Sequence, residues 1–116
     1  MADEQNLRVQ VHEVYLLPEV GVIADATIIG GVLQRGVQVR IQSSGEVATV
    51  GKLEKNFFPV QTASLGDHVG IRLDFPFKVA VDTDSPNERN FHRLIRVPDE
   101  LIVETGSAKD QPAIAI

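Results

Sequence analysis

The chain has 116 residues, of which 43% are hydrophobic and 23% charged. These values predict one globular domain with one core and exclude a disordered chain. The absence of cysteine excludes disulfides and thiolate metal sites, and no apolar run is long enough for a transmembrane helix. A formal net charge of −5 disfavours binding of nucleic acid by diffuse attraction. The polar, acidic residues 1–10 lack the pattern of a signal peptide, so the expected location is the cytoplasm.

In the first third of the chain, apolar and polar residues alternate with the period of a half-buried β-strand. A first strand is expected over residues 7–16, with a change of phase at His12–Glu13 that indicates a β-bulge. Pro18 cannot donate to a strand ladder and therefore ends this strand. Two further strands are expected over residues 22–29 and 37–41.

The middle third continues the strand pattern. A long strand around Val47 is expected to have two faces. One is shared by Val47, Thr49, Gly51, Leu53 and Phe57, and the other by Glu46, Lys52, Glu54 and Asn56. The turn Leu65-Gly66-Asp67 then leads to a strand with an alternating inward face, formed by Val69, Ile71 and Leu73.

The last third carries weaker signals, and no segment has a convincing helical period. An edge strand is expected over residues 75–81, followed by the polar loop Asp82–Glu88. Residues 91–97 and 101–105 are expected to form a pair of strands joined at Pro98-Asp99.

Together these elements predict an all-β fold, a small closed antiparallel β-barrel. The expected organisation is a barrel over residues 7–75, a short C-terminal β extension packed on it over residues 76–105, and a flexible tail over residues 106–116. The apolar end of that tail, Ala113–Ile116, is a candidate for pairing with an exposed sheet edge. Five residues are assigned to tight turns: Gly21, Gly31, Gly36, Gly66 and Asp67.

Gly70 lies inside a predicted strand. Glycine at such a position indicates a bulge or the close approach of another backbone.

The spacing of glycines and apolar residues between Val11 and Leu73 resembles domain II of the translation GTPases, the elongation factor Tu domain 2-like barrel. The segments that carry the resemblance are Gly21-Val22-Ile23, Gly31 to Gly36, Ala63 to Asp67, and Val69-Gly70-Ile71. The resemblance implies a closed barrel that accompanies a GTPase domain without being its catalytic part.

In detail, Gly21–Ala24, Arg35 and Val39–Arg40 are most similar to the C-terminal barrel of bacterial translation initiation factor two. That barrel holds the formylmethionyl end of initiator tRNA. The resemblance therefore implies a ligand groove, which falls here at Asp25, Ala26, Lys55, Val69 and Gly70. Of these, Gly70 agrees with the family, whereas Ala26 and Val69 replace its two cysteines and Lys55 replaces its arginine.

Motifs for catalysis are missing from the sequence. It contains no G-x-x-x-x-G-K-[ST] phosphate loop, no asparagine-lysine-x-aspartate stretch for reading guanine, and no G-x-S-x-G nucleophile elbow. We therefore expect a protein that is not an enzyme and that uses no cofactor.

Metal binding is not expected either. His12, His68 and His92 are scattered along the chain without the spacing of metal ligands. The loop Asp82–Glu88 gathers oxygen ligands, so weak binding of a cation such as calcium is conceivable. It lacks the central glycine of an EF-hand, which favours a solvated turn.

Basic and aromatic residues cluster between positions 89 and 96. On the expected strand, side chains would alternate between two faces, with Arg89, Phe91 and Arg93 on one and His92, Leu94 and Arg96 on the other. An aromatic ring beside arginines suits stacking of single-stranded RNA. The favoured alternative is that the arginine stems cover the apolar rim of the barrel.

Four of the five phenylalanines lie in two Pro-containing segments, Phe57-Phe58-Pro59 and Phe75-Pro76-Phe77. One ring of each pair is expected to pack inward and the other outward, which makes Phe58 and Phe75 candidate anchors for a partner. The alternative, given equal weight, is that these phenylalanines form a second small core beneath the C-terminal extension.

These observations favour a stand-alone, non-enzymatic binding module for a protein, ribonucleoprotein or tRNA-related partner. Direct RNA binding is possible but disfavoured by the net charge, and no membrane partner is expected. The alternative is a structural protein that forms homo-oligomers through an edge strand.

Overall fold

The computed structural model describes residues 6–81 and 87–103 of the chain. Its elements, in chain order, are β1 (Arg8–Leu17), β2 (Gly21–Gly30), β3 (Val32–Gln34), β4 (Gln38–Ile41), β5 (Val47–Lys55), β6 (Phe58–Pro59), β7 (Thr62–Ser64), β8 (His68–Asp74), β9 (Lys78–Ala80), β10 (Glu88–Asn90), α1 (Phe91–Leu94) and β11 (Glu100–Val103). No helix in these two ranges is long and apolar enough to cross a membrane.

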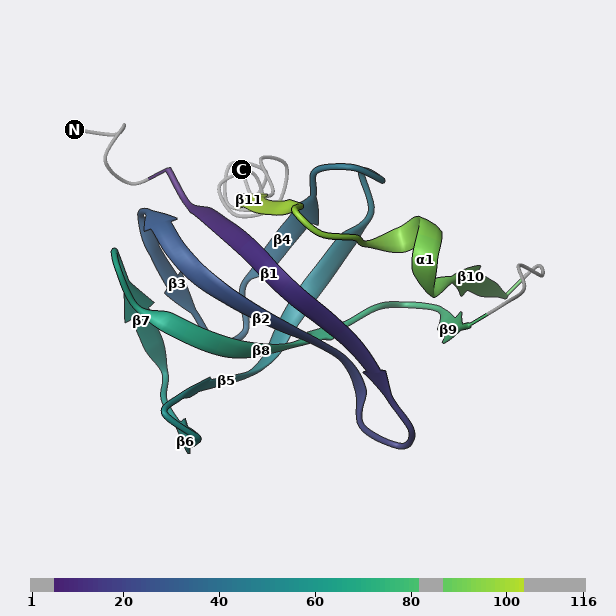
Figure 1. Cartoon of the computed structure of the whole chain (residues 1–116), viewed down its shortest axis with the longest axis horizontal. Helices are drawn as coiled ribbons and strands as arrows, with labels where there is room; N and C mark the ends of the chain where they lie inside the picture. Colours follow the sequence, from purple (N-terminus) through teal and green to yellow (C-terminus); the bar gives the residue numbers. More distant parts are fainter. Residues whose placement is uncertain (1–5, 82–86, 104–116) are drawn as a thin grey trace, which may run out of the picture.

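Six antiparallel strands in the described ranges close into a barrel (Figure 1). Their order is β4-β11-β1-β2-β8-β5, and pairing of β4 with β5 completes the ring. β6 extends the sheet beside β5, while β3 pairs with β7 and β9 with β10 in two small additional sheets. The predicted all-β, closed antiparallel barrel is confirmed.

The predicted bulge in β1 is present. The register against β2 shifts between Val11 and Glu13, so His12 is the additional residue. Val9 and Val11 point into the core, whereas His12 and Glu13 are both exposed. The bulge therefore places two consecutive polar side chains on the outer surface, and Pro18 follows the last strand residue as expected.

In β5 the predicted single face, shared by alternate residues from Val47 to Leu53, is wrong. Val47 and Thr49 are only half-buried, and the core side chains are Ala48 and Val50, followed by Leu53. The register against β8 shifts between Val50 and Lys52, so the alternation changes phase at the intervening glycine. A local irregularity of this kind reverses which side chains face the core.

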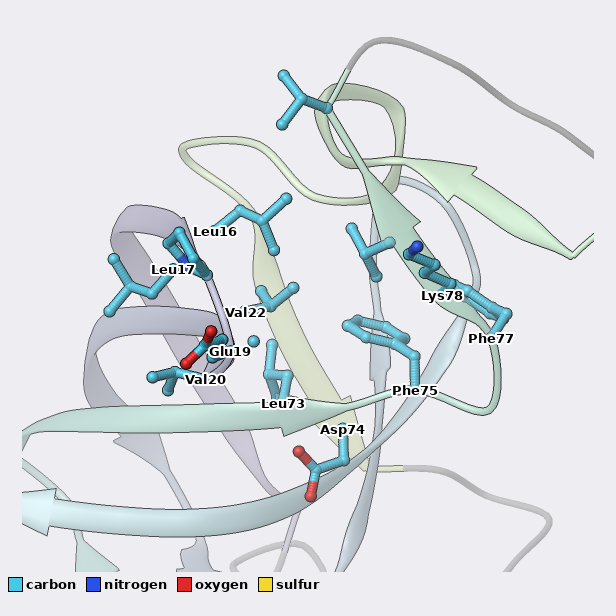
Figure 2. Close-up of a pocket in the computed structure, with 14 residues that line it drawn as sticks. Leu16, Leu17, Glu19, Val20, Val22, Leu73, Asp74, Phe75, Phe77 and Lys78 are labelled. Atoms are coloured by element: carbon cyan, nitrogen blue, oxygen red, sulfur yellow. The ribbon is translucent and has the colours of Figure 1, made fainter.

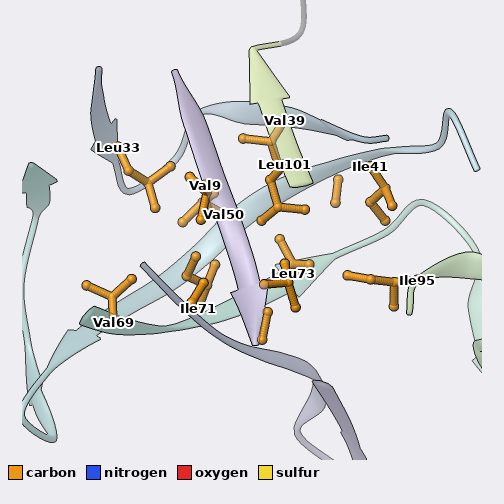
Figure 3. Packing of buried hydrophobic residues seen from close by; sticks show 14 of the residues in the cluster. Val9, Leu33, Val39, Ile41, Val50, Val69, Ile71, Leu73, Ile95 and Leu101 are labelled. Carbon is orange, nitrogen blue, oxygen red and sulfur yellow. The ribbon is translucent and has the colours of Figure 1, made fainter. Parts of the chain in front are cut away.

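The core fills the barrel (Figure 3). Every wall strand contributes fully buried aliphatic side chains, such as Val9, Ile28, Val39, Val50, Ile71 and Leu101. Burial of each contributes about 1.5–3 kcal/mol to folding. The predicted inward face of β8 is confirmed, because Val69, Ile71 and Leu73 are all buried.

The region after β10 corrects the prediction that residues 91–97 and 101–105 form a pair of strands. Residues 91–94 form the short helix α1 instead of a strand, and β11 pairs with β1 and β4 instead of with residues 91–97. The side chain of Asn90 caps the helix by accepting a hydrogen bond of 2.8 Å from the His92 amide. Phe91 and Leu94, three residues apart, both face the core, which is the spacing of a helical turn. The expected extension thus supplies β11 to the barrel wall.

Asp99 ties this region to the barrel and is a buried charged residue, with 4% exposure. Its carboxylate accepts hydrogen bonds from the Ser43 hydroxyl at 2.7 Å, the Ser43 amide at 3.1 Å and the Arg96 amide at 3.0 Å. Its backbone carbonyl accepts from the Val11 amide at 2.9 Å. One residue therefore connects the turn after β4, the segment after α1, and β1.

The turn glycines have the left-handed backbone that the sequence predicts, with positive φ at Gly21, Gly31, Gly36 and Gly66. Gly31 is also crowded, because a Cβ there would lie 2.8 Å from the carbonyl oxygen of Asn6 and from the Leu7 Cα. At Gly36 a Cβ would meet open space. Glycine is therefore required at Gly31 both by the crowded packing and by the positive φ, whereas at Gly36 only the positive φ favours it.

Candidate binding cleft

A cleft of about 570 Å³ lies on the outer face of the barrel, across β2, β8 and the end of β5. Its lining combines aromatic, acidic and aliphatic groups and consists of Tyr15, Ile23, Asp25, Glu54, Asn56, Phe57, His68, Val69 and Gly70. No described residue after Gly70 lines it, so the described C-terminal elements leave this face open.

Gly70 forms the floor of the cleft. It pairs in regular register with Asp25 on β2 and Glu54 on β5, without a bulge. A Cβ built on Gly70 would have no atom within 4 Å. The expectation of a bulge or a close backbone is therefore wrong, and the missing side chain leaves open space instead.

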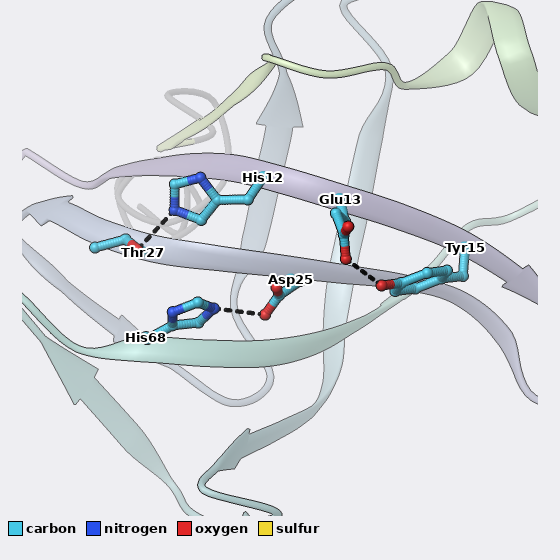
Figure 4. A network of polar contacts seen from close by, with 6 residues as sticks. All are labelled: His12, Glu13, Tyr15, Asp25, Thr27 and His68. Carbon is cyan, nitrogen blue, oxygen red and sulfur yellow. Dashed lines mark hydrogen bonds and ion pairs between the residues drawn. The ribbon is translucent and has the colours of Figure 1, made fainter.

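A row of polar side chains crosses β1, β2 and β8 beside the cleft (Figure 4). His68 Nε2 lies 2.7 Å from the Asp25 carboxylate, and His12 Nε2 lies 2.8 Å from the Thr27 hydroxyl. The two imidazole rings have centroids 5.6 Å apart. Next to them, the Tyr15 hydroxyl donates to Glu13.

Sequence reasoning missed this row because it treated the histidines as scattered. They come together because β2 lies between β1 and β8, and because His12, next to the buried Val11, points outward by the ordinary alternation of a strand. The bulge adds Glu13 to the same outer face. The sequence pattern predicts these outward directions, but it indicates a neighbour only once the strand order is known.

The residues assigned to the groove by resemblance separate into two groups. Asp25, Val69 and Gly70 belong to the lining of the cleft, but the Val69 side chain is only 2% exposed and packs in the core, as does Ala26, which is 0% exposed and outside the lining. Lys55 is not part of the lining and forms an ion pair of 3.0 Å with Asp67. The structure thus brings Asp25 and Gly70 together with His68 and Phe57, which the sequence did not assign to the groove.

Asp67 holds the turn before β8. The Ser64 amide donates to its carboxylate at 2.9 Å, and this bond together with the Lys55 ammonium lowers the pKa of the carboxyl. A carboxyl whose pKa is depressed by folding adds stability above its unfolded pKa, and this contribution is lost as pH falls through the folded value.

Replacing Asp67 by asparagine should therefore flatten the acid dependence of stability. Between pH 5 and 3, where an ordinary carboxyl takes up its proton, D67N should lose less of its urea midpoint than the parent chain. Urea titrations at each pH measure this. Equal losses in both proteins would show that the Ser64 and Lys55 contacts do not favour the ionised carboxylate.

The predicted inward and outward division of the phenylalanine pairs is wrong in both segments. Phe57 and Phe58 both face solvent, with 90% and 71% exposure. Phe75 and Phe77 are both half-buried against the core, with ring centroids 5.3 Å apart. The hairpin tip therefore carries both exposed rings, and Phe57 forms a wall of the cleft.

Phe57 also has a left-handed backbone, with φ of 70°. Because this conformation is unfavourable for a bulky residue, Phe57→Gly should raise the free energy of unfolding by roughly 1 kcal/mol, measured by chemical denaturation. Phe58→Gly is the control and should bring no such gain. A loss of stability in F57G would show that the ring packs on the barrel.

The basic and aromatic residues between positions 89 and 96 do not lie on one strand, as the sequence predicts, but on β10, on α1 and on the segment that follows the helix. Phe91 is 9% exposed and contributes to the core, so it does not provide a stacking surface for RNA. Arg89 lies over the Phe77 ring, 5.0 Å from its centroid, and Nε lies 3.8 Å from Glu46. Arg93 belongs to α1, and Arg96 follows the helix.

Within residues 6–81 and 87–103, no group of three or more His, Asp or Glu side chains has an arrangement that could hold a metal ion. Most of the loop Asp82–Glu88, considered above for cation binding, lies outside the described residues, as does the tail 106–116.

Comparison with known proteins relates this barrel to translation factors. No protein-family model matches the chain. Elongation factor 1-alpha of Hyperthermus butylicus is 31% identical over 70 residues, which cover 60% of this chain and 16% of that protein. The elongation factor SelB of Methanococcus maripaludis, in its apo form, superposes on 88% of this chain with a TM-score of 0.70 and 17% identity. The chain has the translation-factor β-barrel fold.

Other solved structures agree with this assignment of the fold. A bacterial selenocysteine-specific elongation factor matches 88% of the chain with a TM-score of 0.65 and 16% identity. Sup35 complexed with GDP matches 87% with a TM-score of 0.64 and 13% identity. The chain spans 15–21% of the length of these three solved proteins. The elongation factor Tu domain 2-like barrel is thus shown, and the narrower likeness to initiation factor two stays a prediction.

Proposed function

We propose that this translation-factor barrel is a non-enzymatic binding module, and that the cleft around Gly70 receives part of a protein or ribonucleoprotein partner of the translation machinery. The observation that carries the proposal is an open cleft of about 570 Å³ whose floor is a strand glycine and whose wall is a fully exposed phenylalanine. Exposed aromatic rings beside a concave surface are the usual anchors of an interface.

The absence of a phosphate loop from the sequence supports a role without GTP hydrolysis. The proposed role is therefore binding of a partner by the barrel, without a catalysed reaction. We also keep the cytoplasm as the expected location, since a partner from the translation machinery would be met there.

The charges of the cleft limit what it can contact. Carboxylates of Asp25 and Glu54 line it; Asp25 is hydrogen-bonded to His68, and Glu54 forms an ion pair with Lys52. Two carboxylates disfavour a phosphate in the cleft itself. A protein segment, or an uncharged part of a ribonucleoprotein, therefore suits this surface better than an RNA backbone.

Filling the cleft tests the proposal. Gly70→Leu adds a side chain into open space, so the fold should keep its thermal midpoint while affinity for the partner falls at least tenfold. Gln38→Leu adds an apolar side chain at an exposed position on β4, outside the cleft, and should leave affinity unchanged. Binding is measured by co-sedimentation with purified ribosomes and by fluorescence anisotropy with charged tRNA.

If the parent chain binds neither ribosomes nor charged tRNA, nor any purified protein of the translation machinery, the proposed function is wrong. If it binds and G70L binds equally well, the module uses another surface, and the assignment of the cleft is overturned.

A further inference from the structure

A second concave surface lies at the end of β1, and none of its lining residues belongs to the Gly70 cleft. It is an apolar groove of about 690 Å³ between the β1–β2 hairpin and the segment that leads from β8 into β9 (Figure 2). Half-buried or buried aliphatic and aromatic side chains form its floor and walls, among them Leu16, Val22, Leu73, Phe75 and Val79. Leu17 and Val20 stand at its rim with 42% and 52% exposure.

The groove borders an unpaired stretch of β1. β11 pairs with β1 only over Arg8–Gln10, and the Asp99 carbonyl adds one hydrogen bond to the Val11 amide. From His12 to Leu17, the ladder of β1 in the described part of the chain runs to β2 alone. An open strand edge beside an apolar groove fits an extended segment that supplies backbone hydrogen bonds and apolar side chains.

We propose that residues Ala113–Ile116 of the same molecule occupy this groove as a strand added to the free edge of β1. These residues lie outside the described part of the chain, and their sequence fits the site. Ile114 and Ile116 are two residues apart, so in a strand both point to one face, toward the groove. The segment carries no charged side chain, which suits a largely apolar lining.

The chain is long enough to make this connection. Ile102 pairs with Arg8, so β11 leaves the barrel near the start of β1. The nine residues between Val103 and Ala113 span up to roughly 33 Å when extended. The middle of the free edge lies about six residues along β1, or roughly 20 Å, from that point. Because the segment is tethered, its effective concentration at the groove is in the millimolar range, which favours the same molecule over a second copy.

The first test uses a peptide on a truncated chain. A fluorescein-labelled peptide of residues 109–116 should bind a variant that stops at Pro112, and should bind the full chain at least tenfold more weakly, because there the groove is occupied. Fluorescence anisotropy measures both affinities. Equal affinity for the two proteins, or no binding to the truncated one, would overturn the proposal.

Val20 and Val32 provide a matched pair of variants, because both valines are about half exposed, at 52% and 50%, and only Val20 lines the groove. In the truncated chain, V20D should weaken peptide binding at least tenfold and V32D should leave it unchanged. Equal effects of the two variants contradict the proposed location.

Amide hydrogen exchange on the full chain tests the intramolecular pairing. Between Glu13 and Leu17, exchange at the β1 amides that point away from β2 should accelerate at least tenfold when Ile114 and Ile116 are both replaced by aspartate, while β8 amides keep their rates. Light scattering should give a monomer for both proteins. A dimer of the parent chain that the double variant dissociates would show pairing between copies, and would overturn the intramolecular form. None of these measurements involves a translation partner, so their failure is distinct from failure of the proposed function.

Discussion

Replacing Asp99 by alanine is expected to lower the free energy of unfolding by about 3 kcal/mol, since a buried carboxylate that accepts three hydrogen bonds is lost. The variant leaves the Ser43 and Arg96 amides without their acceptor. It also loosens the connection between the turn after β4 and the segment that enters β11. Urea denaturation followed by circular dichroism measures the change.

Ser43→Ala is the matched control for this variant. It removes only the 2.7 Å bond from the hydroxyl and keeps both amide bonds to Asp99, so it should cost about 1 kcal/mol. If D99A and S43A are equally destabilised, the two backbone amides contribute nothing, and the assigned role of Asp99 is wrong.

Gly31→Ala should be the second severe substitution, with a loss of roughly 3 kcal/mol. The new methyl group would meet the backbone of Asn6 and Leu7 at 2.8 Å, in addition to the cost of a left-handed φ of 73°. Because the contacts are with backbone atoms, no side chain can rotate away to relieve them. The start of β1 and the end of β2 must separate instead.

Gly36→Ala isolates the conformational part of that cost. Gly36 has a φ of 95°, and a Cβ there would meet nothing within 4 Å, so the loss should be about 1 kcal/mol. Thermal and chemical denaturation of both variants should therefore differ clearly. Equal losses would show that the backbone around Gly31 yields without cost.

The barrel was predictable because its strongest signals are local. The alternation in β8, the phase change at His12–Glu13 and the glycines of the turns each depend on neighbouring residues, and each is confirmed. In β5 the same reasoning failed, because a bulge at Gly51 reverses the face of the strand that turns to the core. A glycine inside a strand indicates a bulge, but Gly70 meets the same criterion and lies in regular register, so the sequence does not tell which of the two glycines carries the bulge.

The end of the chain was harder to predict for a different reason. Phe91 and Leu94 share a face in a helical turn and would lie on opposite faces of a strand, but four residues are too few for a period to be recognised. The role of Asp99 depends on Ser43, 56 residues away, and no local pattern reveals such a partner.

The candidate cleft could be predicted only in part. Resemblance indicated Asp25 and Gly70, which do face it, but it also indicated Ala26 and Val69, whose side chains are buried. Two lining residues were missed. His68 reaches the cleft because β8 lies next to β2 in the sheet, and Phe57 points outward because of its left-handed backbone conformation.

Closure of the barrel by β11 has a consequence for biosynthesis. The first wall strand to emerge from the ribosome pairs with the last, as the contact between Arg8 and Ile102 shows. A nascent polypeptide released before residue 100 lacks β11, so it would expose unpaired strand edges on β1 and β4 that the complete barrel covers. Premature termination should therefore produce fragments that aggregate. During synthesis, the barrel should close only after the four residues of β11, Glu100–Val103, have left the ribosome.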